Sequence, residues 1–152
     1  MNDTSATYRD DNHANAQAQS AGLRIQFPSL MENVRIVESF IENARERFAI
    51  DDDVYGNILV SVMEAVNNAI QHGNKLDKNK NVTLQLLPSE SQLTFIISDE
   101  GPGYNLDDLP DPTRPDNIEK PNGRGIFLIR HLADQVLFQN NGAAVELTFY
   151  VQ

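Results

Sequence analysis

Apolar and polar residues alternate with two different periods along this chain, and each period predicts a different kind of element. The segment Leu23–Phe27 alternates apolar and polar side chains, which is typical of a half-buried strand. Over Leu30–Ile50 the apolar residues recur every three or four positions instead, which predicts an amphipathic helix. The same spacing continues over Asp51–His72, with Asp51–Asp53 as the expected cap and Gly73 as the expected stop.

The C-terminal part of the chain returns to strand-like patterns, interrupted by one more helix. Val82–Leu87 and Leu93–Ser98 predict two strands joined by a short polar turn. Gln135–Gln139 and Ala143–Val151 predict a closing hairpin around an Asn-Asn-Gly turn. Helical spacing is present over Gly125–Ala133. These elements predict an α+β fold, a two-layer sandwich with helices on one face of a mixed, mostly antiparallel sheet.

Two segments have no regular pattern. Residues 1–22 contain almost no large apolar side chains, so we expect a disordered polar tail followed by a single domain over residues 23–152. The stretch Gly101–Asn122 contains five prolines and little periodicity. A structureless stretch of about 20 residues inside a compact domain is often a functional lid. We therefore expect a lid there.

The composition excludes several classes of function. The chain of 152 residues has no cysteine, so disulfides, thiolate zinc sites and cysteine nucleophiles are excluded. A net charge of −10 argues against direct binding to nucleic acid or to anionic membranes, whose affinity depends on Lys and Arg. No apolar run approaches the roughly 20 residues of a spanning helix, and no signal-peptide core precedes Leu23. We expect a cytoplasmic protein.

Three short polar segments carry the candidate chemistry, and the first lies on the second predicted helix. Glu64 and Asn68 are four residues apart, which places them on one helix face. The Asn68 amide oxygen is a hard ligand for Mg²⁺, and Glu64 could accept a proton from an attacking hydroxyl. His72 follows near the same stripe. A solvated polar face, or capping of the helix end, would explain the same residues.

The second segment, Asp99-Glu-Gly101-Pro-Gly103, comes directly after an apolar strand. A carboxylate at a strand end can accept a hydrogen bond from an exocyclic amine, which would distinguish adenine from guanine. The two glycines would let the backbone approach a base closely. A simple Asp-Glu-Gly turn is the alternative interpretation.

The third segment, Gly123-Arg124-Gly125-Ile126, stands before the last predicted helix. Backbone N–H groups at a helix N-terminus can hold phosphate oxygens, and Arg124 could add a charged fork. An ordinary loop-to-helix turn explains this segment equally well. The segment matches neither the dinucleotide-binding nor the P-loop fingerprint.

In this order, the three segments resemble the motifs of the Bergerat-fold (GHKL) ATPases. Glu64-x-x-x-Asn68 is similar to the N box, Asp99-x-Gly101-x-Gly103 to the first glycine box, and Gly123-x-Gly125 to the second. Two segments most resemble the motifs of the anti-sigma-factor serine/threonine kinases. They are Glu-Ala-Val-Asn-Asn-Ala-Ile-Gln-His-Gly and Gly-Arg-Gly-Ile-Phe-Leu-Ile-Arg. The match runs from about Leu23 to the end of the chain.

The resemblance implies specific roles. Glu64 would be the general base, Asn68 would bind Mg²⁺, and Asp99 would bind the adenine amine of ATP. The expected nucleotide-binding set is completed by His72, Gly101, Gly103, Gly123, Arg124, Gly125 and Ile126. The family phosphorylates a serine or threonine on a small anti-anti-sigma protein, and some members, usually homodimers, sequester a sigma factor. The chain departs from the pattern at Pro121-Asn122, where no arginine directly precedes Gly123.

Two functional hypotheses follow, and a third is disfavoured. The first is an ATP-dependent protein kinase that phosphorylates an antagonist protein. The second is a nucleotide-dependent binding module that sequesters a sigma factor or another regulator without catalysis. The third is a sensor histidine kinase catalytic domain. We do not favour it, because no dimerisation helix with a phospho-acceptor histidine is expected before Leu23.

Overall fold

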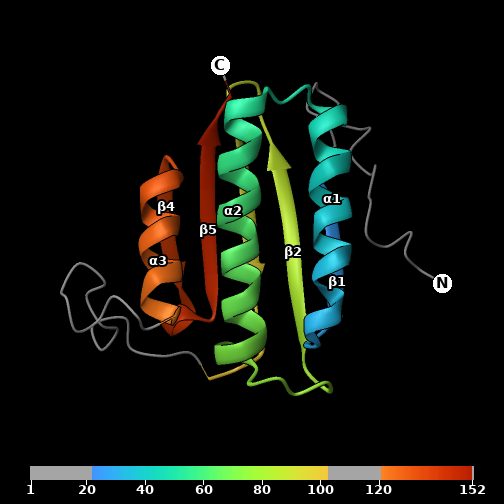
Figure 1. Cartoon of the computed structure of the whole chain (residues 1–152), viewed down its shortest axis with the longest axis vertical. Coiled ribbons are helices and arrows are strands. Elements are labelled where there is room, and N and C mark those ends of the chain that lie inside the picture. Colours follow the sequence, from blue (N-terminus) through green and yellow to red (C-terminus); the bar gives the residue numbers. More distant parts are fainter. Residues whose placement is uncertain (1–21, 103–120, 152) are drawn as a thin grey trace.

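The protein is described from a computed structural model, in which residues 22–102 and 121–151 are placed well enough to describe. The expected tail and most of the expected lid lie outside these ranges. Helices and strands form two layers, and the helices of the described residues lie side by side on one face of the sheet (Figure 1). In chain order, the main elements are β1 (Leu23–Pro28), α1 (Val34–Arg47), α2 (Asp52–Asn68), β2 (Asn81–Pro88), β3 (Gln92–Ser98), α3 (Pro121–Leu132), β4 (Gln135–Gln139) and β5 (Ala144–Tyr150).

The sheet has five strands in the order β1-β2-β3-β5-β4. Every neighbouring pair is antiparallel, so the expected α+β sandwich is confirmed and the sheet is antiparallel throughout rather than mixed. Ser98 at the end of β3 pairs with Ala144 at the start of β5. This register brings the Asp99 turn beside the Asn140–Gly142 turn that joins β4 to β5.

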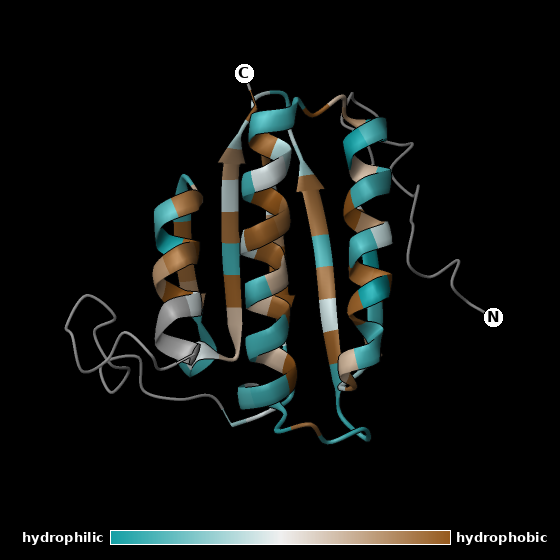
Figure 2. Cartoon of the chain, viewed as in Figure 1, coloured by the Kyte–Doolittle hydropathy of each residue, from teal (hydrophilic) through white to brown (hydrophobic). Residues whose placement is uncertain are grey.

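The core lies between the sheet and the helices, with α2 in the middle of the helical layer (Figure 1). Ile58, Val62, Val66 and Ile70, the face expected from the spacing, are all fully buried. Their spacing of four residues keeps them on one side of the helix, over the buried side chains of the central strands. The outward side of α1 is mostly hydrophilic (Figure 2). No helix in the described part of the chain is long and apolar enough to cross a membrane.

Several element boundaries differ from the expectation for local physical reasons. The first helix starts with a 3₁₀ turn at Met31–Asn33 and ends at Arg47, before Ala49 adopts a positive φ of 52°. Helix α3 starts at Pro121 rather than at Gly125, because proline suits the first turn, where its missing N–H is not needed. Asp51 occupies the cap position of α2 but makes no capping hydrogen bond through its side chain.

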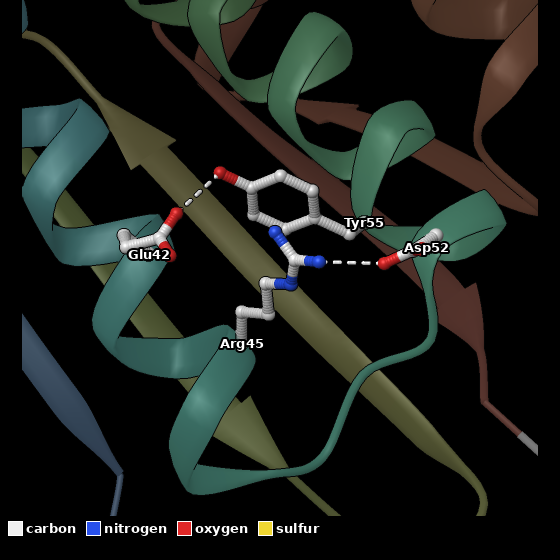
Figure 3. Close-up of polar contacts among 4 residues, drawn as sticks. All are labelled: Glu42, Arg45, Asp52 and Tyr55. Carbon is white, nitrogen blue, oxygen red and sulfur yellow. Dashed lines mark hydrogen bonds and ion pairs between the residues drawn. The ribbon is translucent and has the colours of Figure 1, made fainter.

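A polar cluster joins α1 to the first turn of α2 (Figure 3). The Tyr55 hydroxyl donates a hydrogen bond of 2.8 Å to Glu42. The Arg45 guanidinium lies 4.4 Å from the centre of the Tyr55 ring and pairs with Asp52 at 2.6 Å. Asp52 also lies in the first turn of α2, where a negative charge favours the helix dipole. The cluster therefore fixes the start of α2, at the end remote from Glu64 and Asn68.

Candidate functional site

The C-terminal half of α2 presents Glu64 and Asn68 toward α3, as their spacing predicts. Gly125 of α3 lies directly over both side chains. A Cβ atom added at Gly125 would be 2.8 Å from Glu64 Oε1 and 3.3 Å from Asn68 Nδ2. Carbon and oxygen atoms in ordinary contact are about 3.5 Å apart, so any side chain at this position would displace the end of Glu64. The third motif is thereby packed against the first.

Asp99 leaves the end of β3 at the same end of the molecule. Its N–H donates a hydrogen bond of 2.8 Å to the Ala143 carbonyl, and its Oδ1 accepts one of 2.8 Å from the Gly101 N–H. Burial raises the pKa of Asp99 above its usual value, because desolvation disfavours the charged form. The Gly101 hydrogen bond and the nearby Lys80 charge act in the opposite direction and lower that pKa.

A small pocket between α2, α3 and the sheet joins the first two motifs. Asn68 and Asp99 are the polar side chains that reach it, and the remaining wall is apolar or backbone. The cavity has a volume of about 20 Å³, close to the space needed by one water molecule. The wall consists of Ala65, Ala69, Ile97, Ile126, Ile129, Phe138, Gly142, Ala143 and Val145.

Helix α2 does not simply stop at Gly73, as expected, but widens into a π turn over Ala69–Gly73. The Asn74 N–H donates to the Ala69 carbonyl at 2.8 Å, which is the i→i−5 bond of a π turn. Gly73 has no positive φ, so its role is not that of a left-handed helix cap. A Cβ at Gly73 would instead overlap all three atoms of the Asp99 carboxyl group. The Asp99 carboxyl group thus occupies the space that a side chain at residue 73 would fill.

The comparison with known families indicates which class of ligand this pocket binds. The model of the histidine kinase-like ATPase domain matches residues 27–149, which include all the described parts of the site. The chain belongs to the histidine kinase-like ATPase domain family. A nucleotide is therefore the ligand class of this ATPase domain.

Relatives and one solved structure agree with this family. The serine-protein kinase RsbW of Bacillus subtilis is 29% identical over 136 residues, covering 85% of each chain. RsbW of Listeria monocytogenes is 24% identical over 136 residues, covering 85% of this chain and 87% of the relative. The structure of the RsbU and RsbW domains of Rv1364c from Mycobacterium tuberculosis gives a TM-score of 0.57 at 15% identity. It covers 88% of this chain but 32% of that longer chain, and it supports the fold alone.

Within this ATPase domain, the structure brings together only part of the expected set. Asn68, Asp99 and Ile126 line the pocket, Glu64 and Gly125 lie at its edge, and Gly101 lies behind Asp99. His72 is exposed on the π turn and does not line the pocket, because the wider turn rotates it off the Glu64–Asn68 stripe. Its nucleotide-binding role stays a prediction.

Parts of the two glycine motifs lie outside the described residues. Gly103 falls in the undescribed stretch, and so does the side chain of Arg124, although its backbone belongs to the first turn of α3. The expectation that Gly123-x-Gly125 precedes a helix is wrong, because both glycines lie inside α3. The N-terminal N–H groups of that helix consequently belong to the turn that begins at Pro121.

The residues present fit a metal held jointly with a nucleotide. No group of three or more His, Asp or Glu side chains within residues 22–102 and 121–151 could hold a metal by itself. Asn68 nevertheless has a buried Nδ2 atom without a hydrogen-bond partner. Because amide nitrogen and oxygen are interchangeable by a flip, this position can present Oδ1 to a cation instead. Mg²⁺ normally keeps few protein ligands and takes the rest from phosphates and water.

Sequence reasoning missed two residues of the site. Gly73 was expected only as a helix stop, and Asn74 was not among the expected site residues. Asn74 is buried, with 1% of its surface exposed, and its side chain binds the turn that follows Asp99. No periodicity or spacing marks either residue. The sequence marks Gly73 in one way only: it is the last residue of the segment that resembles the family motif.

Proposed function

We propose that this chain is an ATP-dependent protein kinase that transfers the γ-phosphoryl group to a serine or threonine of a partner protein. One observation carries the proposal: Asn68 and Asp99 reach into an otherwise apolar pocket, and Glu64 lies one helical turn from Asn68. The ATPase family indicates that the ligand is a nucleotide, and the relatives named serine-protein kinase RsbW indicate the class of reaction.

Asp99 would recognise the base. A carboxylate accepts hydrogen bonds but donates none when ionised, so it suits the exocyclic amine of adenine and opposes the carbonyl at the same position of guanine. Apolar neighbours such as Ile97 and Ile126 would cover the faces of the ring. Because this site rejects guanine by leaving polar groups unpaired, we expect ATP to bind more tightly than GTP.

Asn68 and Glu64 would serve the phosphate end of the site. Asn68 would hold Mg²⁺ together with the nucleotide, and the metal would supply positive charge against the negative charge that develops during transfer. Glu64 would accept the proton of the serine hydroxyl as its oxygen attacks the γ-phosphorus and the bond to ADP breaks. Gly125 packs on both side chains and so limits their rotation.

The protein substrate follows from the family resemblance rather than from the pocket. We propose a small anti-anti-sigma protein as the phospho-acceptor and a sigma factor as a second partner. Homodimer formation and a cytoplasmic location stay predictions of the sequence. The non-catalytic sequestering module remains the competing hypothesis, and the experiments below distinguish the two.

The role of Glu64 is tested by Glu64→Gln, with Glu38→Gln as its control. Glu38 is exposed on α1, and both changes remove one negative charge. We expect Glu64→Gln to lower phosphoryl transfer by about 10²–10⁴-fold, the usual contribution of a general base, while ATP affinity is retained. The control should match the wild type. Transfer at the wild-type rate by Glu64→Gln would remove Glu64 as the base.

The metal ligand is tested by calorimetry of ATP binding with and without Mg²⁺. Asn68→Ala should lose the Mg²⁺-dependent part of the affinity, whereas Asn57→Ala, an exposed change in the same helix, should keep it. GTP serves as the control ligand and should bind weakly to every variant. If the wild type binds no nucleotide under any of these conditions, the kinase proposal fails and sequestration is left.

A further inference from the structure

Asn74 is a buried amide whose side chain bonds the end of β1, the start of β2 and the turn after β3. Its Oδ1 accepts a hydrogen bond of 2.8 Å from the Glu100 N–H. Its Nδ2 donates to Ser29 Oγ at 2.7 Å and to the Asn81 carbonyl at 3.0 Å. These partners use both amide hydrogens and the oxygen. A flipped amide would set donor against donor at Glu100, so the network itself fixes the orientation.

These bonds connect segments that are far apart in the sequence. Ser29 follows β1 and is fully buried, and it donates in turn to the Lys80 carbonyl at 2.7 Å. Asn81 starts β2, and Glu100 lies in the turn after β3. The Asn74 backbone also closes the π turn that ends at Gly73. One side chain thus joins the end of the helical layer to one edge of the sheet and to the turn after β3.

The Glu100 N–H belongs to the residue that directly follows Asp99. The peptide between Asp99 and Glu100 is planar, so its N–H, the Asp99 carbonyl and the Asp99 Cα move as one unit. Because the Asp99 N–H is also held, by the Ala143 carbonyl, the two peptides that flank this Cα together set the direction of its Cα–Cβ bond. Two further contacts act on the same turn: the Asp99 N–H binds Ala143, and the Glu100 carboxylate accepts from the Asn81 N–H at 3.0 Å. Asn74 supplies the contact from the helix side.

We infer that Asn74 is a positioning residue for base recognition: its Oδ1 holds the Glu100 peptide and thereby aims the Asp99 carboxylate at adenine. This inference rests on the proposed role of Asp99. It makes the preference for ATP over GTP depend on a residue that does not itself line the pocket. A merely structural amide would stabilise the fold without affecting the choice of base.

The readout is therefore the dissociation constant for GTP divided by that for ATP, measured by calorimetry. A lower ratio means a weaker preference for ATP. When a variant is partly unfolded, both apparent constants rise by the same factor, because both nucleotides bind the same folded population. The ratio cancels that factor. It also remains measurable for a variant of reduced stability, such as Asn74→Ala.

Three variants separate positioning from stability. Asn74→Ala removes the acceptor at Glu100 and should lower the ratio about tenfold, the effect of one lost hydrogen bond. Ser29→Ala removes a partner on the donor side, so it should lower stability and leave the ratio within about twofold of the wild type. Asn74→Asp keeps an oxygen toward the Glu100 N–H and should restore most of the ratio, despite a lower stability.

Asp99→Asn tests the premise separately, since an amide can donate to the guanine carbonyl and should itself lower the ratio. A drop with Asp99→Asn and with Asn74→Ala, but not with Ser29→Ala, supports the inference. A drop with Asp99→Asn alone overturns it and leaves the role of Asp99 intact. An equal drop with Ser29→Ala, or no recovery with Asn74→Asp, also overturns it. An unchanged ratio in Asp99→Asn removes both the role of Asp99 and the inference.

Discussion

The contact between Gly73 and Asp99 yields the sharpest stability prediction. In Gly73→Ala the new methyl group would overlap the Asp99 carboxyl group, so that side chain must rotate away. Rotation breaks its hydrogen bond with the Gly101 N–H, and a hydrogen bond to a charged group contributes about 1.5–3 kcal/mol. Alanine recovers about 1 kcal/mol of helical propensity. We expect a net loss of about 0.5–2 kcal/mol in urea unfolding.

The same change should weaken ATP binding, because the displaced carboxylate no longer faces the pocket. Gly56→Ala is the matched control, since Gly56 is an exposed glycine of α2 whose Cβ would meet nothing within 4 Å. That variant should gain about 0.5–1 kcal/mol and bind ATP normally. In an Asp99→Ala background, Gly73→Ala should become neutral or stabilising. An identical loss in both backgrounds would refute the overlap as the cause.

Three other predictions concern activity and pH. Gly125→Ala pushes on Glu64 and should slow single-turnover phosphoryl transfer about ten- to hundredfold at nearly constant ATP affinity; an unchanged rate contradicts the packing argument. Tyr55→Phe should cost less than about 1 kcal/mol in urea unfolding. Because the hydrogen bond to Glu42 raises the pKa of Tyr55 above 10.0, this difference should vanish as the pH rises through that pKa, and a pH-independent difference would contradict it. Asp99→Asn should stabilise the nucleotide-free protein at neutral pH, since burial raises the pKa of Asp99 above 3.8. Urea unfolding at decreasing pH should show this extra stability fade as Asp99 of the wild type becomes protonated. An extra stability that grows in acid would contradict the prediction.

The repeating patterns of the sequence predicted most of the fold because they report burial directly. The buried apolar positions Ile58, Val62, Val66 and Ile70, in α2 and the π turn after it, follow from their spacing, and so do the two hairpins β2–β3 and β4–β5. Boundaries were less predictable, since they depend on single backbone conformations such as the positive φ of Ala49. The π turn at Ala69–Gly73 was missed, because its extra residue per turn leaves no trace in the hydrophobic pattern.

The candidate site was predictable only where a residue type itself carries chemistry. Glu64, Asn68 and Asp99 were found because a carboxylate or an amide at a helix face or strand end suggests a ligand. Asn74 was not, since its importance comes from where the sheet register and the helix end place its partners. A buried amide with three partners looks the same in the sequence as an exposed one in a loop.

The glycines show that a correct residue can be predicted for the wrong reason. Gly73 was expected to stop a helix, Gly101 to let the backbone approach a base, and Gly125 to help hold phosphate at a helix start. None of the three has a positive φ, whereas Gly142, in the hairpin turn, has one of 92°. Each of the three is instead a point where two segments meet too closely for a Cβ: Gly73 on Asp99, Gly101 on the Gly73 carbonyl, and Gly125 on Glu64. Alanine at these positions therefore tests packing between the motifs rather than backbone strain. The three motifs thus pack so closely at these glycines that a Cβ at any one of them would displace a neighbouring backbone segment or side chain.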